Sequence, residues 1–167
     1  MPSSSYAIAL GSNRPGRHGP PEREVTAAIA ALGAITAVSP ILRTPALGPA
    51  GRSFANAVAI VETGEDPPML LRRLKAIERT FGRRSGRRWG ARVIDLDIIL
   101  WSEGAWADQR LTVPHPHFRT RAFVLDPLAR VAPRWRDPLT GRTVRQLQAV
   151  HRRARRSDGV DHAARAP

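Results

Sequence analysis

The chain has 167 residues, no cysteine and a formal net charge of +13 at pH 7. This length suits one domain, and the lack of cysteine excludes disulfides and thiolate metal sites while allowing a reducing compartment. No apolar run approaches the roughly 20 residues that span a bilayer, and residues 1–5 lack the features of a signal peptide, so we expect a cytoplasmic protein without a membrane partner.

Arginine supplies almost all of the positive charge, since Lys75 is the only lysine. A polyanion such as nucleic acid is the simplest partner for this charge, and coding bias on a solvated surface is the other explanation. The arginines concentrate in residues 83–92 and 152–156. The second cluster lies in a polar stretch, so we expect one domain over residues 1–151 and a basic, disordered tail over residues 152–167.

The first half of the chain alternates apolar runs with turn-forming residues. Residues 6–10 form a short apolar run closed by glycine, serine and asparagine, which predicts a buried strand. Helical spacing of apolar residues follows over residues 21–32. Residues 35–43 and 54–61 predict the next two strands, and Pro40 places the first of them at a sheet edge or a bulge.

The second half begins with an amphipathic helix over residues 67–81, capped by Asp66. Residues 93–100 are the clearest strand. The order is therefore β-α-β-β-α-β, the split pattern of ferredoxin-like folds, in which helices pack on one face of an antiparallel sheet. Further on, residues 111–113 predict a short strand, and two helices are expected over residues 123–131 and 144–151.

Two acidic residues interrupt the clearest strand. Alternation places Asp95 and Asp97 on one face and the apolar residues 94, 96, 98 and 100 on the other. The two positions are roughly 6 to 7 Å apart, so the pair could hold two ions about 3.5 to 4 Å apart. Magnesium is the expected ion because carboxylate and phosphate oxygens are its usual ligands. A polar strand face without a metal is the alternative.

Five arginines surround Trp89 just before these acids: Arg83, Arg84, Arg87, Arg88 and Arg92. A phosphate chain bridged by magnesium needs this combination, because acids hold the ions while arginines neutralise the phosphate oxygens. A salt-linked loop would also explain the cluster.

A second polar group, residues 110–121, contains His115 and His117. A zinc site is a weak hypothesis here, because the pair supplies two ligands and catalytic zinc generally uses three. Hydrogen bonding to phosphate, or packing, is favoured. The chain has no Walker motif, so a nucleotide site must be of another design.

Six motifs occur in the chain in this order: Gly11-Ser12-Asn13, Arg-Thr-Pro-Ala-Leu-Gly-Pro at 43–49, Phe-Ala-Asn-Ala at 54–57, Arg-Trp-Gly-Ala-Arg at 88–92, Asp-Leu-Asp at 95–97, and Arg-Leu-Thr-Val-Pro-His at 110–115. The chain resembles hydroxymethyl-dihydropterin pyrophosphokinases in this order, from about residue 6 to about residue 147. The last three motifs together are close to diagnostic, whereas the first alone would be weak.

The resemblance implies an α+β, ferredoxin-like βαββαβ core with an antiparallel sheet and additional C-terminal helices. It implies transfer of pyrophosphate from ATP to 6-hydroxymethyl-7,8-dihydropterin in folate biosynthesis, with AMP as the other product. It assigns two magnesium ions to Asp95 and Asp97. The implied pterin-binding residues are Thr44, Pro45, Leu47, Gly48, Phe54, Asn56, Trp89, Asp95 and Phe123. Phe54 and Phe123 would stack on the pterin; without the resemblance, both would be interpreted as core residues.

The implied ATP-binding residues are Lys75, Glu78, Arg84, Trp89, Arg92, Ile98, Arg110, Thr112, His115 and Arg121. The implied catalytic residues are Arg83, Arg92, Asp95 and Asp97. The loop 83–88 is one residue shorter than in the family, which leaves the role of Arg84 open. Lys75 and Pro116 depart from the family pattern near the adenine. No residue is assigned as a general base.

Two other functions fit the same composition. A nucleic-acid-binding module would use aromatic residues on its sheet, but only 5% of the chain is aromatic. An inactive relative acting as an interaction protein would not need both acids and the arginines. We therefore expect a monomeric enzyme that does not bind nucleic acid.

Overall fold

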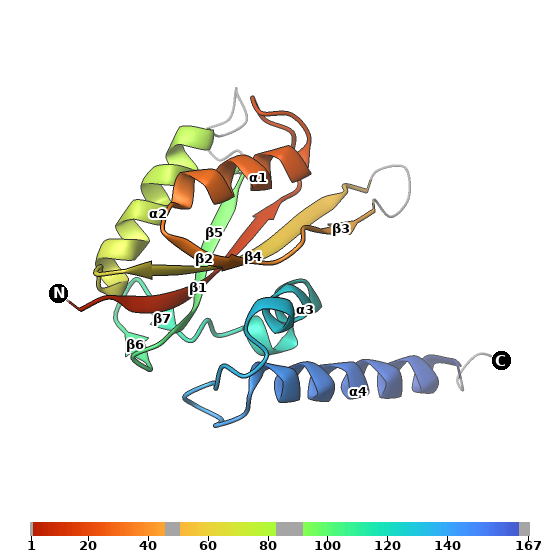
Figure 1. Ribbon diagram of the computed structural model, residues 1–167. Coiled ribbons are helices and arrows are strands. Elements are labelled where there is room, and N and C mark those ends of the chain that lie inside the picture. The colour runs from red at the N-terminus through yellow and green to blue at the C-terminus, as the bar shows by residue number, and fades with distance from the viewer. Residues whose placement is uncertain (1, 46–50, 83–91, 164–167) are drawn as a thin grey trace.

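The central strand of the sheet is β1 (Ser4–Ser12), which lies between β4 (Phe54–Thr63) and β5 (Asp95–Trp101) and is antiparallel to both. The computed structural model describes residues 2–45, 51–82 and 92–163. The far side of β4 pairs with β2 (Ile35–Val38) and β3 (Leu42–Thr44) (Figure 1). This strand order is that of the predicted ferredoxin-like core.

The predicted strand over residues 35–43 is divided into β2 and β3 around Pro40, which has no N–H to donate to a neighbouring strand. Ser39 maintains the pairing before the break. Its backbone N–H donates to the carbonyl oxygen of Val58 at 2.9 Å, and its Oγ accepts from the Val58 N–H at 3.0 Å. The prediction placed Pro40 at a sheet edge or a bulge, and the structure shows the edge, because β2 ends the strand order and β3 pairs with β4.

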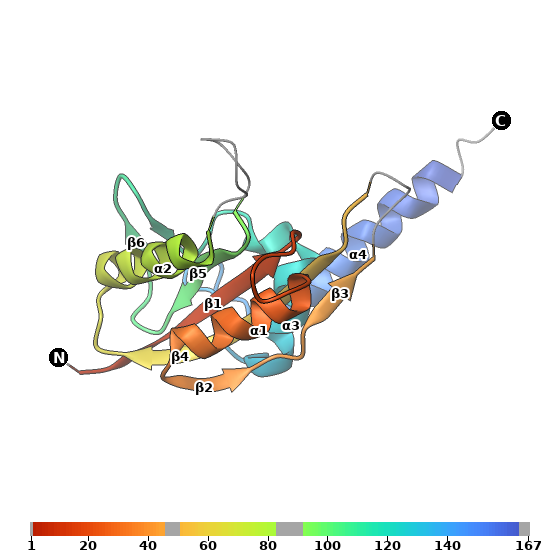
Figure 2. The ribbon, with the colours of Figure 1, turned by 90° about the horizontal axis from the view of Figure 1, so that it is seen from above.

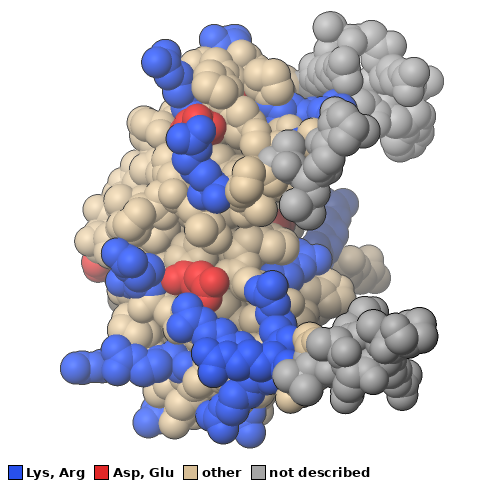
Figure 3. Space-filling model, turned by 90° about the vertical axis from the view of Figure 1, so that its right-hand side faces the viewer, with Lys and Arg blue, Asp and Glu red and all other residues tan. Residues whose placement is uncertain are grey.

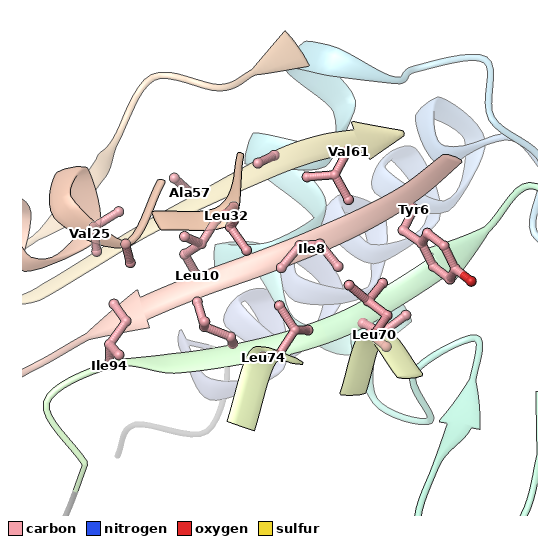
Figure 4. Close-up of a cluster of buried hydrophobic side chains, with 14 of the residues drawn as sticks. Tyr6, Ile8, Leu10, Val25, Leu32, Ala57, Val61, Leu70, Leu74 and Ile94 are labelled. Atoms are coloured by element: carbon pink, nitrogen blue, oxygen red, sulfur yellow. The ribbon is translucent and has the colours of Figure 1, made fainter. Parts of the chain in front are cut away.

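Two helices, α1 (Pro21–Leu32) and α2 (Pro67–Phe81), cover one face of the sheet. The carboxylate of Asp66 accepts a hydrogen bond from the Met69 N–H at 2.9 Å, so the predicted cap of α2 is confirmed. Gly82 ends α2 with a φ of 83°, a conformation that favours glycine. A cluster of buried side chains from both helices and the sheet fills this side (Figure 4): it includes Tyr6, Ile8, Leu10, Val25, Leu32, Ala57, Val61, Leu70, Leu74 and Ile94.

The other face of the sheet is covered by α3 (Ala122–Val131), which follows the short 3-10 helix η1 (Phe118–Thr120). The small hairpin of β6 (Trp106–Ala107) and β7 (Thr112–Val113) precedes η1. The expectation of helices on one face is therefore incomplete, because β1, β4 and β5 present apolar side chains to both faces: Ala7, Val58, Ile60 and Ile99 pack toward α3. A nucleic-acid-binding module that stacks bases on its sheet would need an exposed sheet face, and α3 covers this one.

A bulge in β5 changes which residues face each core. Ile8 pairs with Ile98 and Ala7 with Leu100, so Ile99 is an extra residue in β5. Leu96 and Ile98 pack toward α1 and α2 as predicted, but Leu100 packs toward α3. The prediction for Leu100 is wrong because the bulge reverses the alternation beyond Ile98.

The last helix, α4 (Val144–Ala163), packs on α3 and extends past the sheet (Figures 1 and 2). It is longer than the predicted helix 144–151, so residues 152–163, expected to be a disordered tail, are helical. Residues 152–159 are all exposed, and Figure 3 shows basic side chains gathered around this end of the molecule. None of the helices within the described ranges is long and apolar enough to cross a membrane.

Candidate functional site

A pocket of about 660 Å³ opens between the sheet and the start of α3. It collects residues from β1, β3, β4, β5 and α3, together with the segment that precedes η1. The lining residues are Ala9, Leu10, Gly11, Ser12, Asn13, Thr44, Phe54, Asn56, Asp95, Asp97, Ile99, His115, Arg121, Phe123 and Val124. Of the predicted site residues, the structure brings together Thr44, Phe54, Asn56, Asp95, Asp97, His115, Arg121 and Phe123.

Two phenylalanines line this pocket from different layers of the fold. Phe54 is the first residue of β4, and Phe123 lies in the first turn of α3. Their exposed fractions are 45% and 44%, although the core contains phenylalanines that are almost completely buried. Nearly half-exposed aromatic rings in a pocket are available to a flat ligand, whereas core residues would not be.

Asn56 adds an amide to the same pocket. It is 8% exposed, and its neighbour across the sheet is Gly11. A Cβ at Gly11 would come within 2.9 Å of the Asn56 amide oxygen, so the glycine of the Gly-Ser-Asn motif makes room for this amide. A buried amide without matched partners is unfavourable, and the edge of a heterocycle offers such partners.

Asp95 and Asp97 both line the pocket, as strand alternation predicts. Asp95 is exposed as a residue, but partial desolvation of its carboxyl in the pocket raises the pKa of this group, and the negative charges of Glu78 and Asp97 raise it further. A bound cation would relieve this repulsion. Among the described residues, no group of three or more histidine and acidic side chains forms a metal site, so the zinc hypothesis at His115 and His117 finds no third ligand there. Two carboxylates suit magnesium, which completes its coordination with water and phosphate oxygens.

His115 is held in one tautomer. The backbone N–H of His117 donates to His115 Nδ1 at 3.1 Å, so this nitrogen is an acceptor and the neutral ring carries its proton on Nε2. Burial lowers the pKa of His115, and the nearby Arg121 and His117 also lower it, although Asp97 acts in the opposite direction. His115 therefore presents a neutral N–H donor near the Asp97 carboxylate.

A second pocket, of about 480 Å³, is lined by Lys75, Glu78, Arg79 and Arg92. Glu78 is 5% exposed and organises this pocket. Its carboxylate accepts hydrogen bonds from Arg92 at 2.8 Å and from the Leu96 N–H at 2.9 Å, and Lys75 Nζ lies 3.3 Å away. Glu78 thus orients the Arg92 guanidinium and attaches α2 to β5 beside Asp95 and Asp97.

Other predicted residues lie elsewhere. The side chain of Ile98 is buried in the core on the α2 side, and those of Arg110 and Thr112 are exposed at the β6–β7 hairpin. Pro45 is exposed next to Thr44. Five predicted residues lie outside the described residues: Leu47, Gly48, Arg83, Arg84 and Trp89.

Residues 7–133 of the chain match the family model of 7,8-dihydro-6-hydroxymethylpterin-pyrophosphokinase (HPPK). The chain belongs to the HPPK family. HPPK members are ATP-dependent pyrophosphokinases of folate biosynthesis, and the predictions of family and of enzyme class are confirmed.

Bacterial HPPK enzymes are similar over most of the chain. The 2-amino-4-hydroxy-6-hydroxymethyldihydropteridine pyrophosphokinase of Pseudomonas aeruginosa is 43% identical over 149 residues, which are 86% of this chain and 89% of that enzyme. The enzyme of the same name from Synechocystis is 39% identical over 152 residues, which are 88% of this chain and 77% of that enzyme.

Solved structures of HPPK-DHPS from Plasmodium falciparum share the fold. The wild-type protein with pteroate superposes with a TM-score of 0.66 at 14% sequence identity and covers 89% of this chain. This chain spans 42% of that protein's length. The similarity confirms the predicted fold class.

Two buried apolar residues of the pocket lining, Ile99 and Val124, were not expected from the sequence. Alternation already places Ile99 on the face of Asp95 and Asp97, and that signal could have found it. Val124 had no such signal, because its role depends on where α3 docks.

Proposed function

We propose that the larger pocket binds 6-hydroxymethyl-7,8-dihydropterin and transfers to it the β- and γ-phosphates of ATP. One observation carries this assignment: two half-exposed aromatic rings, two carboxylates, an imidazole and a guanidinium line a single pocket. They belong to Phe54, Phe123, Asp95, Asp97, His115 and Arg121. The aromatic rings match a flat heterocycle, and the charged and polar groups match a phosphate chain with its metal ions.

The apolar half of the pocket would bind the pterin. Phe54 and Phe123 stack on the two faces of the ring system, and the Asn56 amide hydrogen-bonds its polar edge. Ile99 and Val124 add apolar surface to the pocket, and the exclusion of water by this surface strengthens the hydrogen bonds made inside it. The hydroxymethyl group would then point toward Asp95 and Asp97.

The polar half would bind the phosphates. Asp95 and Asp97 would hold two Mg²⁺ ions, whose positive charge would neutralise the phosphates. His115 donates its Nε2–H to a phosphate oxygen without adding charge, and Arg121 provides a planar cationic donor. Arg92, oriented by Glu78, stabilises charge on the transferred group from the side of α2.

In the reaction, the hydroxyl oxygen of the pterin substrate forms a bond to the β-phosphorus of ATP. The bond between the β-phosphorus and the oxygen that bridges to the α-phosphate breaks, AMP leaves with that electron pair, and the proton of the attacking hydroxyl is released to water. Alignment of the two substrates contributes most of the acceleration, because phosphoryl transfer depends mainly on positioning and charge stabilisation.

We also propose that the enzyme acts as a monomer in the cytoplasm. The lack of cysteine is compatible with a reducing compartment. Size-exclusion chromatography with light scattering tests the oligomeric state.

The function is tested by measuring AMP formation from ATP with and without 6-hydroxymethyl-7,8-dihydropterin. AMP and the pterin diphosphate should form in equal amounts, and only with a divalent cation. Asp97→Asn is the matched active-site variant. AMP formation that is independent of the pterin, or full activity in excess chelator, would contradict the proposal.

A further inference from the structure

The short helix η1 connects two groups of pocket residues. His115 precedes it, and Arg121 and Phe123 follow it. Backbone hydrogen bonds join these parts: the Phe118 N–H donates to the His115 carbonyl, and the Arg121 N–H donates to the Phe118 carbonyl, each at 3.4 Å. A rotation of η1 would therefore move His115 and Arg121 of the polar half of the pocket together with Phe123 of the apolar half.

Two neighbouring side chains of η1 anchor it to the rest of the protein. Phe118 is completely buried in the core beneath α3. The next residue, Arg119, makes a bidentate ion pair with Asp137, with Nε 2.6 Å from one carboxylate oxygen and the terminal nitrogen 2.8 Å from the other. The Arg119 guanidinium also lies over the Phe118 ring, 4.7 Å from its centroid. Bidentate pairing restricts orientation as well as distance.

Asp137 is itself rigidly held. It is 0% exposed and also accepts hydrogen bonds from the Thr140 hydroxyl at 2.7 Å and from the Leu139 N–H at 3.1 Å. Its backbone closes a tight turn, since its N–H donates to the Arg142 carbonyl at 2.9 Å. This turn leads directly into α4, which packs against η1 and α3.

Asp137 does not belong to the pocket lining, and it lies beyond residue 133, where the match to the HPPK family model ends. Replacing a buried ion pair by apolar residues is often neutral or stabilising, so stability alone is a weak reason for such a pair. The Arg119–Asp137 pair lies at η1, the turn that joins His115 to Arg121 and Phe123, so the pair can orient these pocket residues.

We infer that Asp137 is a positioning residue of the active site, which acts through Arg119 to fix η1 and thereby the directions of His115, Arg121 and Phe123. This inference rests on the proposed function. The assigned residues of the pocket lie on both sides of one turn, and Asp137 determines how that turn is oriented.

The test compares Asp137→Asn with the wild-type protein. The variant keeps the size of the side chain but loses its charge, so kcat/KM should fall by about 10²-fold, the scale expected for a misplacement near 1 Å. Affinity for 6-hydroxymethyl-7,8-dihydropterin, measured by calorimetry, should fall by about tenfold. The matched control is Glu65→Gln, which removes the Arg73 ion pair at 2.8 Å, outside the pocket lining, and should leave both values unchanged.

A double-mutant cycle separates positioning from loss of stability. If Asp137 acts through Phe123, then Asp137→Asn should weaken pterin binding much less in a Phe123→Ala background than in the wild type. All measurements are made well below each melting temperature, with circular dichroism confirming the fold. If Asp137→Asn does not fold, Arg119→Lys serves instead, because it keeps the charge and loses the bidentate geometry.

The inference is overturned if the variant is folded and retains wild-type kcat/KM and pterin affinity, or if its effect and that of Phe123→Ala are additive. These outcomes differ from failure of the proposed function, in which the wild-type protein itself forms no AMP in the presence of the pterin.

Discussion

Replacing Phe123 with alanine would remove one wall of the proposed pterin slot. The ring is 44% exposed without ligand, and a phenylalanine buries about 200 Å² when fully covered. A stacked pterin can therefore cover about 90 Å² of this side chain, worth about 2 kcal/mol at about 25 cal/mol per Å². Loss of this contact should weaken pterin binding by about 30-fold.

The same exposure predicts that Phe123→Ala leaves the fold stable, since the ring contributes little to the core. Phe118→Ala is the contrasting variant, because Phe118 is completely buried and its truncation should cost about 3 to 5 kcal/mol of unfolding free energy. Met69 on α2 is 45% exposed and lies outside the pocket lining, so Met69→Ala controls for loss of an exposed apolar side chain.

Calorimetric titrations with 6-hydroxymethyl-7,8-dihydropterin and with α,β-methylene-ATP measure the two affinities separately. Phe123→Ala should affect the pterin far more than the nucleotide. Equal losses, or a fall in melting temperature as large as that of Phe118→Ala, would show that Phe123 supports the fold and that the proposed slot is wrong.

Three further variants test the polar half of the site. Asp97→Asn should lower Mg²⁺-dependent turnover by at least about 10²-fold with little change in melting temperature; activity close to wild type would contradict its role in metal binding. Burial lowers the pKa of His115 in the folded state, so the unfolded chain binds the proton first and stability is lost as the pH falls below about 6.5. His115→Gln should therefore flatten the dependence of melting temperature on pH between about 7 and 5, and an unchanged slope would refute this. Glu78→Gln should lower the unfolding free energy by about 1.5 to 3 kcal/mol and weaken ATP binding, because Arg92 loses its charged partner. Denaturant titration measures the first effect and calorimetry the second, and the absence of either effect would contradict the role of Glu78.

The element order and the acid pair could be predicted because they depend on local periodicity. Asp66 caps α2, and Asp95 and Asp97 share a strand face, for reasons contained within a few neighbouring residues. The bulge at Ile99 could not be predicted, since it arises from the register between β5 and β1.

The site itself was less predictable than the fold. Phe54 and Phe123 would have been assigned to the core without a family resemblance, because a sequence does not show which face of a helix or strand borders an open pocket. The Arg119–Asp137 pair was missed for a similar reason: its members are 18 positions apart in the sequence, and only the docking of α3 and α4 brings them together.

One helix combines two regions that should differ in stability. Val144 and Leu147 of α4 are buried against the rest of the protein, whereas residues 152–159 are all exposed. Helical segments shorter than about 12 to 15 residues are marginal in water without packing. The amide protons after residue 151 should therefore exchange with deuterium through local fraying, while those near Leu147 exchange only when most of the protein opens. Native-state hydrogen exchange would then detect a boundary near residue 151, in the middle of a continuous helix.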